Sequence, residues 1–295
     1  MIPRGLYLFC YALFMCIASH NQLAGQETAL QPPASQAIQV YLTAAGKADS
    51  AAIMTQSELS VSIDKQPAQV TSLRSAKDEK LLFAVLIDRS TSRTSQAKSI
   101  RKAAMLLFQG LATNGNQGYI VSFNESTLMS KRPLKTSEAR EIINGIQFGG
   151  GTALYDAIFS TIRDVLNRSK NPDFPRRVII LISDGGDNVS RVYQSEAEKI
   201  ANAEGVAIFS LATPNPNYER RGELILNDVS NPTGGKVILS NELEDGVAPL
   251  LTAIHGQWVL SLVPQQAPDQ KLHSLSVKTT QRHVSLSVPA KILLR

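Results

Sequence analysis

Hydrophobic residues follow two different patterns along this chain, and the pattern changes twice. Between residues 38 and 73 they alternate with polar residues, in the segments 38–42, 59–63 and 69–73. This period of two is typical of strands with one buried face. Residues 64–67, Asp-Lys-Gln-Pro, are types that favour turns and are expected to join the second segment to the third. The first part of the chain therefore predicts a small β structure.

From residue 81 the apolar runs become continuous. Residues 81–87 read Leu-Leu-Phe-Ala-Val-Leu-Ile, as expected of a strand that is covered on both faces. Similar runs recur further along the chain, at residues 119–123, 178–182, 206–211 and 237–239. Between them, apolar residues recur with a helical period in the segments 97–111 and 154–165. Strands that alternate with helices predict an α/β fold with a Rossmann-like, doubly wound and mostly parallel sheet.

Capping signals indicate where several helices begin and end. Ser195 and Asn241 are each followed three residues later by a glutamate, which is the spacing of a capped helix start. Gly256 is placed to end the last helix of this region. The α/β domain is therefore expected to span residues 79–256.

A second β region follows the α/β domain. Residues 258–263, 272–277 and 284–288 are short alternating segments separated by turns. The α/β domain is thus flanked by β segments, at residues 37–78 and 257–295. The two flanks either pair into one small β-sandwich or form two separate β appendages, and the sequence fits both arrangements equally well.

The first 24 residues have the features of a secretory signal peptide. Arg4 precedes an apolar run at residues 6–18, which is too short to span a bilayer unaided. The triplet Cys-Ile-Ala that ends at Ala18 has the small-x-small form of a cleavage site, and Ala24 is a second candidate. A buried N-terminal helix is the alternative. We expect a removed leader, followed by a flexible linker at residues 25–36.

The positions of the cysteines determine whether the chain keeps any cysteine after the leader is removed. The chain has two, Cys10 and Cys16, and both lie inside it. A cleaved chain is therefore expected to be free of cysteine and to fold in an oxidising compartment without disulfides. Lipid attachment at Cys16 is disfavoured because the preceding residue, Met15, is large. No later stretch approaches 18 apolar residues, so we expect no membrane-spanning helix.

Size and charge exclude further classes of function. The chain has 295 residues, of which 43% are hydrophobic, so it can bury a substantial core. Its 30 Lys and Arg residues exceed its 25 Asp and Glu residues only slightly, and they form no continuous basic block. We therefore expect no nucleic-acid partner.

Residues with oxygen-bearing side chains follow the predicted strands where each strand ends. Residues 88–92, Asp-Arg-Ser-Thr-Ser, complete the first continuous run, and residues 183–186, Ser-Asp-Gly-Gly, follow a later one. Residues 149–152, Gly-Gly-Gly-Thr, precede a helix expected to begin at Ala153. Because the functional crevice of an open α/β sheet lies beyond the carboxyl ends of its strands, these segments are expected to meet at one edge. The candidate site residues are Asp88, Ser90, Ser92, Thr152 and Asp184.

All five candidate residues offer oxygen atoms, and neither Cys nor His accompanies them. Oxygen sites suit hard divalent cations, so we expect Mg²⁺, with Mn²⁺ or Ca²⁺ as alternatives. Two carboxylates neutralise a divalent ion, while three hydroxyl groups add coordination without charge. Such an ion keeps a position for a carboxylate from another molecule, which predicts a metal-mediated contact between proteins.

Each of these segments also has an ordinary structural interpretation. Ser, Thr and Asp at strand–helix junctions are frequent helix N-caps, and Asp184-Gly185 alone is a common turn sequence. A structural module with a non-functional metal site is therefore an alternative. The metal hypothesis rests on finding all three segments in order, each at a predicted strand end.

The same segments resemble the metal-ion-dependent adhesion site of the von Willebrand factor type A domain. The resemblance is carried by residues 88–92, 151–152 and 184–185, and it covers about residues 80–256. It implies that the two serines and the threonine bind the ion directly or through water, while the two aspartates act largely through water or by charge. It also implies that an Asp or Glu of a protein partner completes the coordination shell.

The flanks are similar to those of exported von Willebrand factor type A-related proteins common in Acidobacteria. The similarity lies in residues 58–64, Glu-Leu-Ser-Val-Ser-Ile-Asp, and in the β segment that begins at Trp258. The chain departs from that group by having Asp64-Lys65 where Asp-Gly is usual. It also ends in Ala-Lys-Ile-Leu-Leu-Arg where an Arg-rich stretch and Gly-Tyr are common, which leaves the last strand undefined.

We expect an exported binding protein, periplasmic or secreted, and not an enzyme. A haloacid-dehalogenase-type phosphatase needs a second acid two residues after Asp88, where the chain has Ser90. A serine hydrolase needs a Gly-x-Ser-x-Gly elbow, and a P-loop needs a Lys after its glycines; neither is present. The histidines at 255, 273 and 283 lie outside the predicted crevice loops, so no general base accompanies the ion. A metal-dependent hydrolase is the alternative.

Basic residues cluster at and after the first of the three loops. Such a cluster attracts an acidic partner surface, although a solvated helix face has the same composition. The cluster consists of Arg89, Arg93, Lys98, Arg101 and Lys102.

Overall fold

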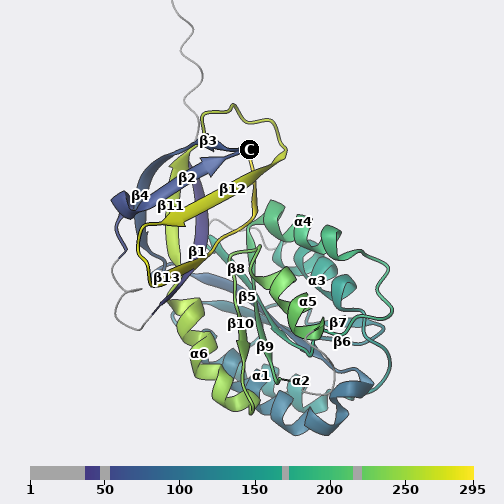
Figure 1. Ribbon diagram of the computed structural model, residues 1–295. Helices are drawn as coiled ribbons and strands as arrows, with labels where there is room; N and C mark the ends of the chain where they lie inside the picture. The colour runs from purple at the N-terminus through teal and green to yellow at the C-terminus, as the bar shows by residue number, and fades with distance from the viewer. Residues whose placement is uncertain (1–36, 47–53, 168–172, 215–220) are drawn as a thin grey trace, which may run out of the picture. The chain divides into compact units, whose positions relative to one another are not determined.

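The two hydrophobic patterns correspond to two kinds of sheet in the computed structural model (Figure 1). The structure describes residues 37–46, 54–167, 173–214 and 221–295. The expected leader and linker, residues 1–36, lie outside the described residues. A six-stranded sheet with helices on both faces forms the α/β part, and the flanks form two four-stranded sheets. Within the described residues, no helix combines the length and the apolar character needed to cross a bilayer.

The six-stranded sheet has the strand order β10-β9-β8-β5-β6-β7. All strands but the edge strand β7 run parallel. Every residue of the central strand β5 is buried, because helices cover both of its faces. The predicted continuous runs are thus confirmed as strands. Their bounds are β5 (Leu81–Asp88), β6 (Gln117–Phe123), β7 (Thr127–Met129), β8 (Arg176–Ile182), β9 (Val206–Ala212) and β10 (Val237–Leu239).

Alternate residues of the parallel strands point into two separate apolar clusters. Phe83 of β5 belongs to the cluster under α1, α2 and α6, while its neighbour Leu82 belongs to the cluster under α3, α4 and α5. The sheet is therefore doubly wound, as expected. The helices are α1 (Ala97–Leu111), α2 (Thr136–Gly145), α3 (Leu154–Thr161), α4 (Gln194–Glu204), α5 (Arg221–Ser230) and α6 (Leu243–His255). A π-helical turn, η3 (Ile162–Leu166), extends α3.

Two predicted helix starts are wrong by one or two residues. Helix α4 begins at Gln194 and not after Ser195, because the Tyr193 N–H donates a hydrogen bond to Glu196 Oε2 at 3.0 Å. Helix α6 begins at Leu243, so Asn241 is not its cap; Glu244 instead accepts a hydrogen bond from Ser99 Oγ on α1 at 2.5 Å. The end of α6 at Gly256 is confirmed.

The two β flanks pair with each other. Strand β1 (Ile38–Gly46) pairs antiparallel with β11 (Trp258–Val263), and β2 (Leu59–Ile63) pairs with β12 (Leu272–Thr279). The two sheets, β13-β1-β11-β4 and β14-β12-β2-β3, share one apolar cluster, to which Leu42 and Ile63 contribute from opposite sheets. The flanks therefore form a single sandwich, one of the two expected arrangements. Its other strands are β3 (Gln66–Pro67), β4 (Gln69–Ser75), β13 (Val284–Ser287) and β14 (Lys291–Leu293).

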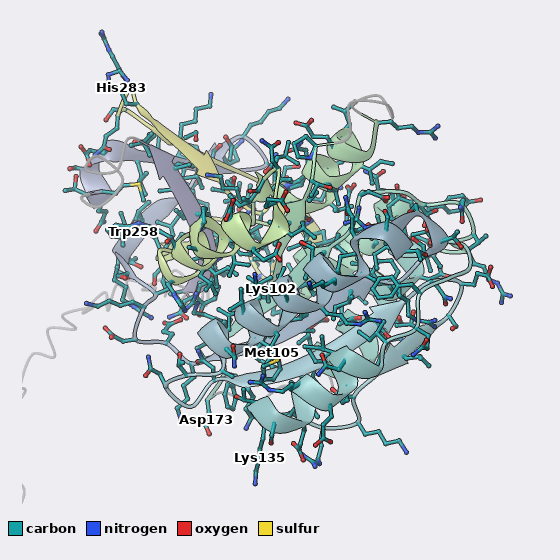
Figure 2. The ribbon with its side chains drawn as sticks, turned by 90° about the horizontal axis from the view of Figure 1, so that it is seen from below. Lys102, Met105, Lys135, Asp173, Trp258 and His283 are labelled. Atoms are coloured by element: carbon teal, nitrogen blue, oxygen red, sulfur yellow. The ribbon has the colours of Figure 1, made fainter. Side chains whose placement is uncertain are left out.

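The sandwich is joined to the amino ends of the parallel strands. Arg176, the first residue of β8, donates hydrogen bonds to the carbonyl oxygens of Ala76 at 3.0 Å and Ile254 at 2.6 Å, and to Gln257 Oε1 at 3.1 Å. Trp258 and His283 mark the sandwich in Figure 2. The carboxyl ends of the parallel strands lie at the opposite edge of the sheet, and this edge carries the candidate site.

Candidate metal centre

Asp88 is the buried starting point of the site. It is the last residue of β5, and its side chain is held from two sides. Ser90 donates to Asp88 Oδ1 from its backbone N–H at 3.0 Å and from its Oγ at 2.6 Å. Ser183, which follows β8, donates from its Oγ to Asp88 Oδ2 at 2.7 Å. Two neighbouring strands thus fix the orientation of one carboxylate.

The polar contacts continue from Asp88 to Asp184. Ser90 Oγ lies 3.3 Å from Ser92 Oγ, and Ser92 Oγ donates to Asp184 Oδ2 at 3.0 Å. The Gly186 N–H donates to Asp184 Oδ1 at 3.0 Å and orients that carboxylate. Four of the five predicted residues therefore form one continuous series of oxygen atoms at the carboxyl edge of the sheet.

The glycine loop that carries Thr152 is bonded to the same segment. The Gly149 N–H donates to the carbonyl oxygen of Arg89 at 2.7 Å. The Thr91 N–H and Thr91 Oγ1 both donate to the carbonyl oxygen of Gly150, each at 3.0 Å. Thr152 itself is buried. These bonds hold the loop of residues 149–152 against the loop that follows β5, so the fifth predicted residue belongs to the same loop cluster.

Sequence reasoning missed the residues that support this loop. Glu125 Oε1 accepts the Gly151 N–H, and Asn188 Oδ1 accepts the Thr152 N–H, both at 2.8 Å. Asp187 Oδ1 accepts the Leu154 N–H at 2.8 Å and so caps α3, where Ala153 had been expected to be the first helical residue. These side chains come from loops after β6 and β8, and only the folded structure brings them to residues 151–154.

The turn at Asp184-Gly185 is held by a close backbone approach. Gly185 has a φ of +82°, which favours glycine. A Cβ placed on Gly185 would lie 2.2 Å from the carbonyl oxygen of Gly222, and a Cβ on Gly222 would lie 2.0 Å from the carbonyl oxygen of Asp184. The start of α5 therefore packs directly on this turn, and both glycines are needed for the packing.

Burial governs the electrostatics of the site. It raises the pKa of Asp88, while the hydrogen bonds from Ser90 and Ser183 lower it, because they stabilise the ionised form. Arg93 is also buried, and its Nη1 lies 3.7 Å from Asp184 Oδ2. The expectation that Arg93 belongs to an exposed basic cluster is wrong: the 3₁₀ helix η2 (Thr91–Gln96) turns this side chain inward, whereas Lys102 is exposed.

The donor atoms fit a hard divalent cation. They are carboxylate and hydroxyl oxygens, and Ser92 and Asp184 leave one side of the site open to solvent, whereas Asp88 and Ser90 close the other. In the described parts of the chain, no cluster of three or more His, Cys, Asp or Glu side chains is suited to a metal. A cation at this edge would therefore need hydroxyl ligands as well as carboxylates.

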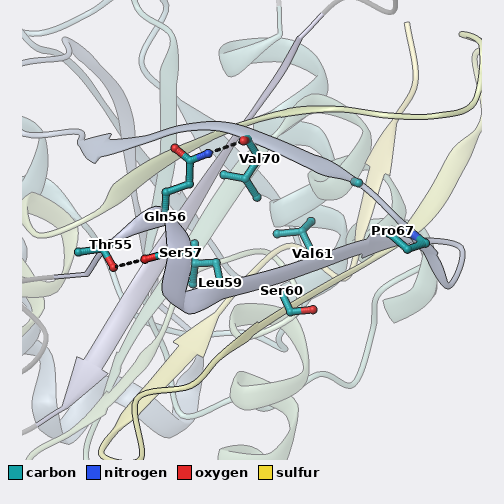
Figure 3. A pocket seen from close by; sticks show the side chains of 9 residues that line it. Thr55, Gln56, Ser57, Leu59, Ser60, Val61, Pro67 and Val70 are labelled. Carbon is teal, nitrogen blue, oxygen red and sulfur yellow. Dashed lines mark hydrogen bonds between the residues drawn. The ribbon is translucent and has the colours of Figure 1, made fainter.

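Two hollows lie away from this edge. The one in Figure 3, about 720 Å³ in volume, lies in the sandwich between η1 (Gln56–Glu58), β2 and β4. It has no charged lining residue, and Gln56 Nε2 donates across it to the carbonyl oxygen of Val70 at 2.5 Å. A second hollow, of about 380 Å³, lies where β1 and β14 approach the start of β9. Neither hollow includes a predicted site residue.

Comparison with known proteins places the fold. Residues 83–245 match the family model of the von Willebrand factor type A domain. No curated protein matches the chain. The structure of a von Willebrand factor type A protein from Catenulispora acidiphila is similar, with 11% identity and a TM-score of 0.51, over 90% of this chain and 75% of that chain.

A mussel protein has a similar fold. Proximal thread matrix protein 1 from the mussel byssus shares 12% identity with a TM-score of 0.50, over 72% of this chain and 50% of that chain. The chain thus spans about half the length of the mussel protein. Another structure of the mussel protein, with a zinc-occupied metal-ion-dependent adhesion site motif, has 15% identity and a TM-score of 0.48, over 66% of this chain and 49% of that chain. At 11 to 12% identity, the likeness to the bacterial protein and to the first mussel structure shows the fold alone.

Proposed function

The chain belongs to the von Willebrand factor type A domain family, and from this premise we propose that it binds a protein partner through a divalent cation. The cation, Mg²⁺ in the first place, is held at the carboxyl edge of the sheet. An Asp or Glu of the partner supplies a further ligand. The five residues that hold the ion are Asp88, Ser90, Ser92, Thr152 and Asp184.

One observation carries this proposal. The side-chain oxygens of Asp88, Ser90, Ser92 and Asp184 form an unbroken series with separations of 2.6, 3.3 and 3.0 Å. Caps of independent helices have no reason to converge in this way, because each needs to contact only its own helix. A convergent set of hard oxygen donors is what a divalent cation requires.

The protein supplies orientation and one open side. Ser90 and Ser183 hold the buried Asp88 carboxylate, so little side-chain freedom is lost when an ion binds. Asp184 keeps 21% of its side chain exposed and faces the side from which a partner arrives. When bound, the ion supplies an electrophilic centre that accepts a carboxylate from outside.

Binding is favoured over hydrolysis by the positions of the described histidines. His255 ends α6, next to the amino edge of the sheet. His273 lies in the sandwich between Asp64 and Asp269, and His283 lies at the far end of the sandwich (Figure 2). A hydrolase with a histidine base needs that histidine within hydrogen-bond reach of its nucleophile, and no described histidine is brought to the candidate centre.

We further propose that the chain is exported and that its leader is removed after Ala18 or Ala24. The proposal follows from the apolar run after Arg4 and the small residues at Ala18 and Ala24. Mass spectrometry of the mature N-terminus tests it. A chain that starts after residue 18 or 24 supports export, and an intact N-terminus contradicts it.

Metal-dependent stabilisation tests the ion. The melting temperature is measured with Mg²⁺ or Mn²⁺ and with chelator, for the wild type, Asp88→Ala and the control Asp245→Ala, which removes an exposed carboxylate of α6. At a metal concentration of about 100 times Kd, the expected stabilisation is about 2.7 kcal/mol, or a shift of about 5–10 °C. Wild type and Asp245→Ala should shift, and Asp88→Ala should not. No shift in the wild type at millimolar metal contradicts the proposal.

Partner capture tests the adhesion function. A partner retained from the native envelope in Mg²⁺ should be lost with chelator and with Ser90→Ala, while Asp245→Ala should retain it. Capture that survives both chelator and Ser90→Ala places the interface elsewhere on the protein.

A further inference from the structure

Arg93 is a buried cation next to the candidate metal centre. Its side chain is 3% exposed, and its Nη1 lies 3.7 Å from Asp184 Oδ2. The Arg93 N–H donates to the carbonyl oxygen of Ser90 at 3.1 Å, which fixes the residue in η2 directly after the two site serines. Its position is therefore set by the same loop that presents the oxygen donors.

The guanidinium of Arg93 does not hold neighbouring residues in place through hydrogen bonds. A separation of 3.7 Å is too long for a hydrogen bond, and Asp184 Oδ2 already accepts a shorter one from Ser92. Within the described residues, Arg93 Nε and Nη2 are buried and have no hydrogen-bond partner. A buried guanidinium so weakly bonded acts on its surroundings chiefly through its charge.

That charge changes the balance of the centre. With both carboxylates ionised, Asp88 and Asp184 contribute −2, and Arg93 brings the total to −1. A bound divalent cation raises the total to +1. Without Arg93 the same two states carry −2 and 0. Arg93 therefore opposes the arrival of the cation and makes the loaded site one unit more positive than it would be without Arg93, which favours the binding of an anion.

We infer that Arg93 makes metal loading depend on the partner, by weakening the cation's binding to the free protein and strengthening the binding of a carboxylate to the loaded site. The inference rests on the proposed function and assigns its regulation. Because metal and carboxylate attract each other, each raises the affinity for the other by the same factor. A site that holds metal weakly by itself then fills mainly when an acidic partner is present.

The experiment separates the two effects of the charge. Mg²⁺ binding to the full chain is measured by calorimetry, and acetate binding to the Mg²⁺-saturated chain by NMR titration. The variants are Arg93→Met, which removes the charge, Arg93→Lys, which keeps it, and Lys98→Met, which removes the same charge from an exposed position on α1.

The expected effects of Arg93→Met have opposite signs. Mg²⁺ should bind about tenfold more tightly or better, and acetate should bind about threefold more weakly or worse. Arg93→Lys should stay near the wild type in both, and Lys98→Met should change each by less than about twofold, because exposed charges are screened. A purely structural role predicts the reverse for the metal, since a damaged site loses affinity for both ligands.

Each outcome decides between the inference and the function on which it rests. If the wild type binds Mg²⁺ and Arg93→Met binds it equally or more weakly, the inference is overturned and the metal site stands. If the wild type fails to bind Mg²⁺ alone while Arg93→Met binds it, Arg93 opposes the cation as inferred, and the proposed function fails unless added acetate restores Mg²⁺ binding to the wild type. If neither binds, both fail.

Discussion

Each of the two edges of the parallel sheet holds a buried arginine, and the two are bonded very differently. Arg176 at the amino edge donates to three acceptors at 2.6 to 3.1 Å. Arg93 at the carboxyl edge has one contact with Asp184, at 3.7 Å. Both side chains are 3% exposed, so burial alone does not distinguish them. Arg176 joins two parts of the fold through its hydrogen bonds, whereas Arg93 keeps a weakly bonded charge next to the candidate metal centre.

The acceptors explain the difference. Arg176 bonds to the backbone carbonyls of Ile254 at the end of α6 and of Ala76 before β5. Each carbonyl also accepts one backbone N–H, from Gln257 at 3.4 Å and from Glu79 at 3.1 Å, so Arg176 occupies a second lone pair. Burial lowers the pKa of Arg176, and the negative charge of Glu79 opposes that shift. Arg93 faces a carboxylate that other donors already satisfy. The amino edge, where the sandwich is joined, is stabilised by the hydrogen bonds of Arg176. The carboxyl edge retains the charge of Arg93, which no hydrogen bond within the described residues offsets.

Arg176→Met is expected to have the largest effect. It removes three hydrogen bonds from a buried charged donor, to the carbonyl oxygens of Ala76 and Ile254 and to Gln257 Oε1, which costs about 3–5 kcal/mol of unfolding free energy. Arg177→Met is the matched control, because Arg177 lies in the same strand and donates one bond, to the carbonyl oxygen of Glu204 at 2.8 Å. The control should lose about 1 kcal/mol in urea denaturation. Equal losses of unfolding free energy in the two variants would show that the three bonds of Arg176 add no stability beyond the single bond of Arg177.

Gly222→Ala is expected to have an intermediate effect at the open edge. The new Cβ would lie 2.0 Å from the carbonyl oxygen of Asp184, so the turn must move, at a cost of about 1–3 kcal/mol. The displaced carboxylate should also weaken Mg²⁺ binding, as measured by calorimetry. Gly145→Ala is the control, because nothing lies within 4 Å of a Cβ at that position. Unchanged metal affinity in Gly222→Ala would separate the glycine packing from the candidate centre.

His273 is expected to have the smallest effect, because its contacts are close to the surface of the sandwich. Its ring nitrogens lie 2.6 Å from Asp64 Oδ2 and 2.8 Å from Asp269 Oδ1. Hydrogen bonds to Asp269 and Asp64 raise the pKa of His273, and those same bonds lower the pKa of each aspartate. These contacts join the turn after β2 to the start of β12.

The sign of the pH dependence follows from these shifts. The histidine contribution is fully present below an unfolded pKa of about 6.5 and is lost as pH rises through the raised folded pKa. The aspartate contribution is present above an unfolded pKa of about 3.9 and is lost as pH falls through the lowered folded value. The melting temperature of wild type should therefore fall relative to His273→Gln as pH rises above about 6.5, by no more than about 4 °C. If wild type and His273→Gln have the same pH profile of melting temperature, the cluster contributes nothing to stability. His283→Gln, at the exposed end of the sandwich, is the control.

Much of the fold could be predicted because apolar patterning encodes it directly. The run at residues 81–87 is apolar throughout, and β5 is buried throughout for that reason. The first residues of the helices were harder to predict from the sequence, because the hydrogen bonds that start a helix depend on which side chains the fold brings there. Tyr193 makes no side-chain capping bond, yet α4 begins directly after it. Strand β14 is only three residues long and depends on pairing with β12, which no local pattern reveals.

The candidate site likewise contains residues that the sequence could place and residues that it could not. Asp88 and Asp184 could be placed at one edge because Asp88 ends the strand β5 and Asp184 follows the parallel strand β8, and strand ends are visible in the sequence. Ser183 and Arg93 could not be assigned. Ser183 is one of many serines until β8 brings its Oγ to 2.7 Å from Asp88 Oδ2. Arg93 has the character of a surface residue, and only the turn geometry of η2 buries it.

The pairing of the two flanks has a mechanical consequence. Since β1 pairs with β11 and β2 with β12, the α/β domain is an insertion whose entry and exit both lie in the sandwich. A pulling force applied between residues 38 and 293 would pass through the hydrogen bonds of the sandwich strands before it reached β5 or α6. The sandwich strands would therefore bear such a force first. A partner bound at the carboxyl edge of the sheet would experience no tension until those strands separated.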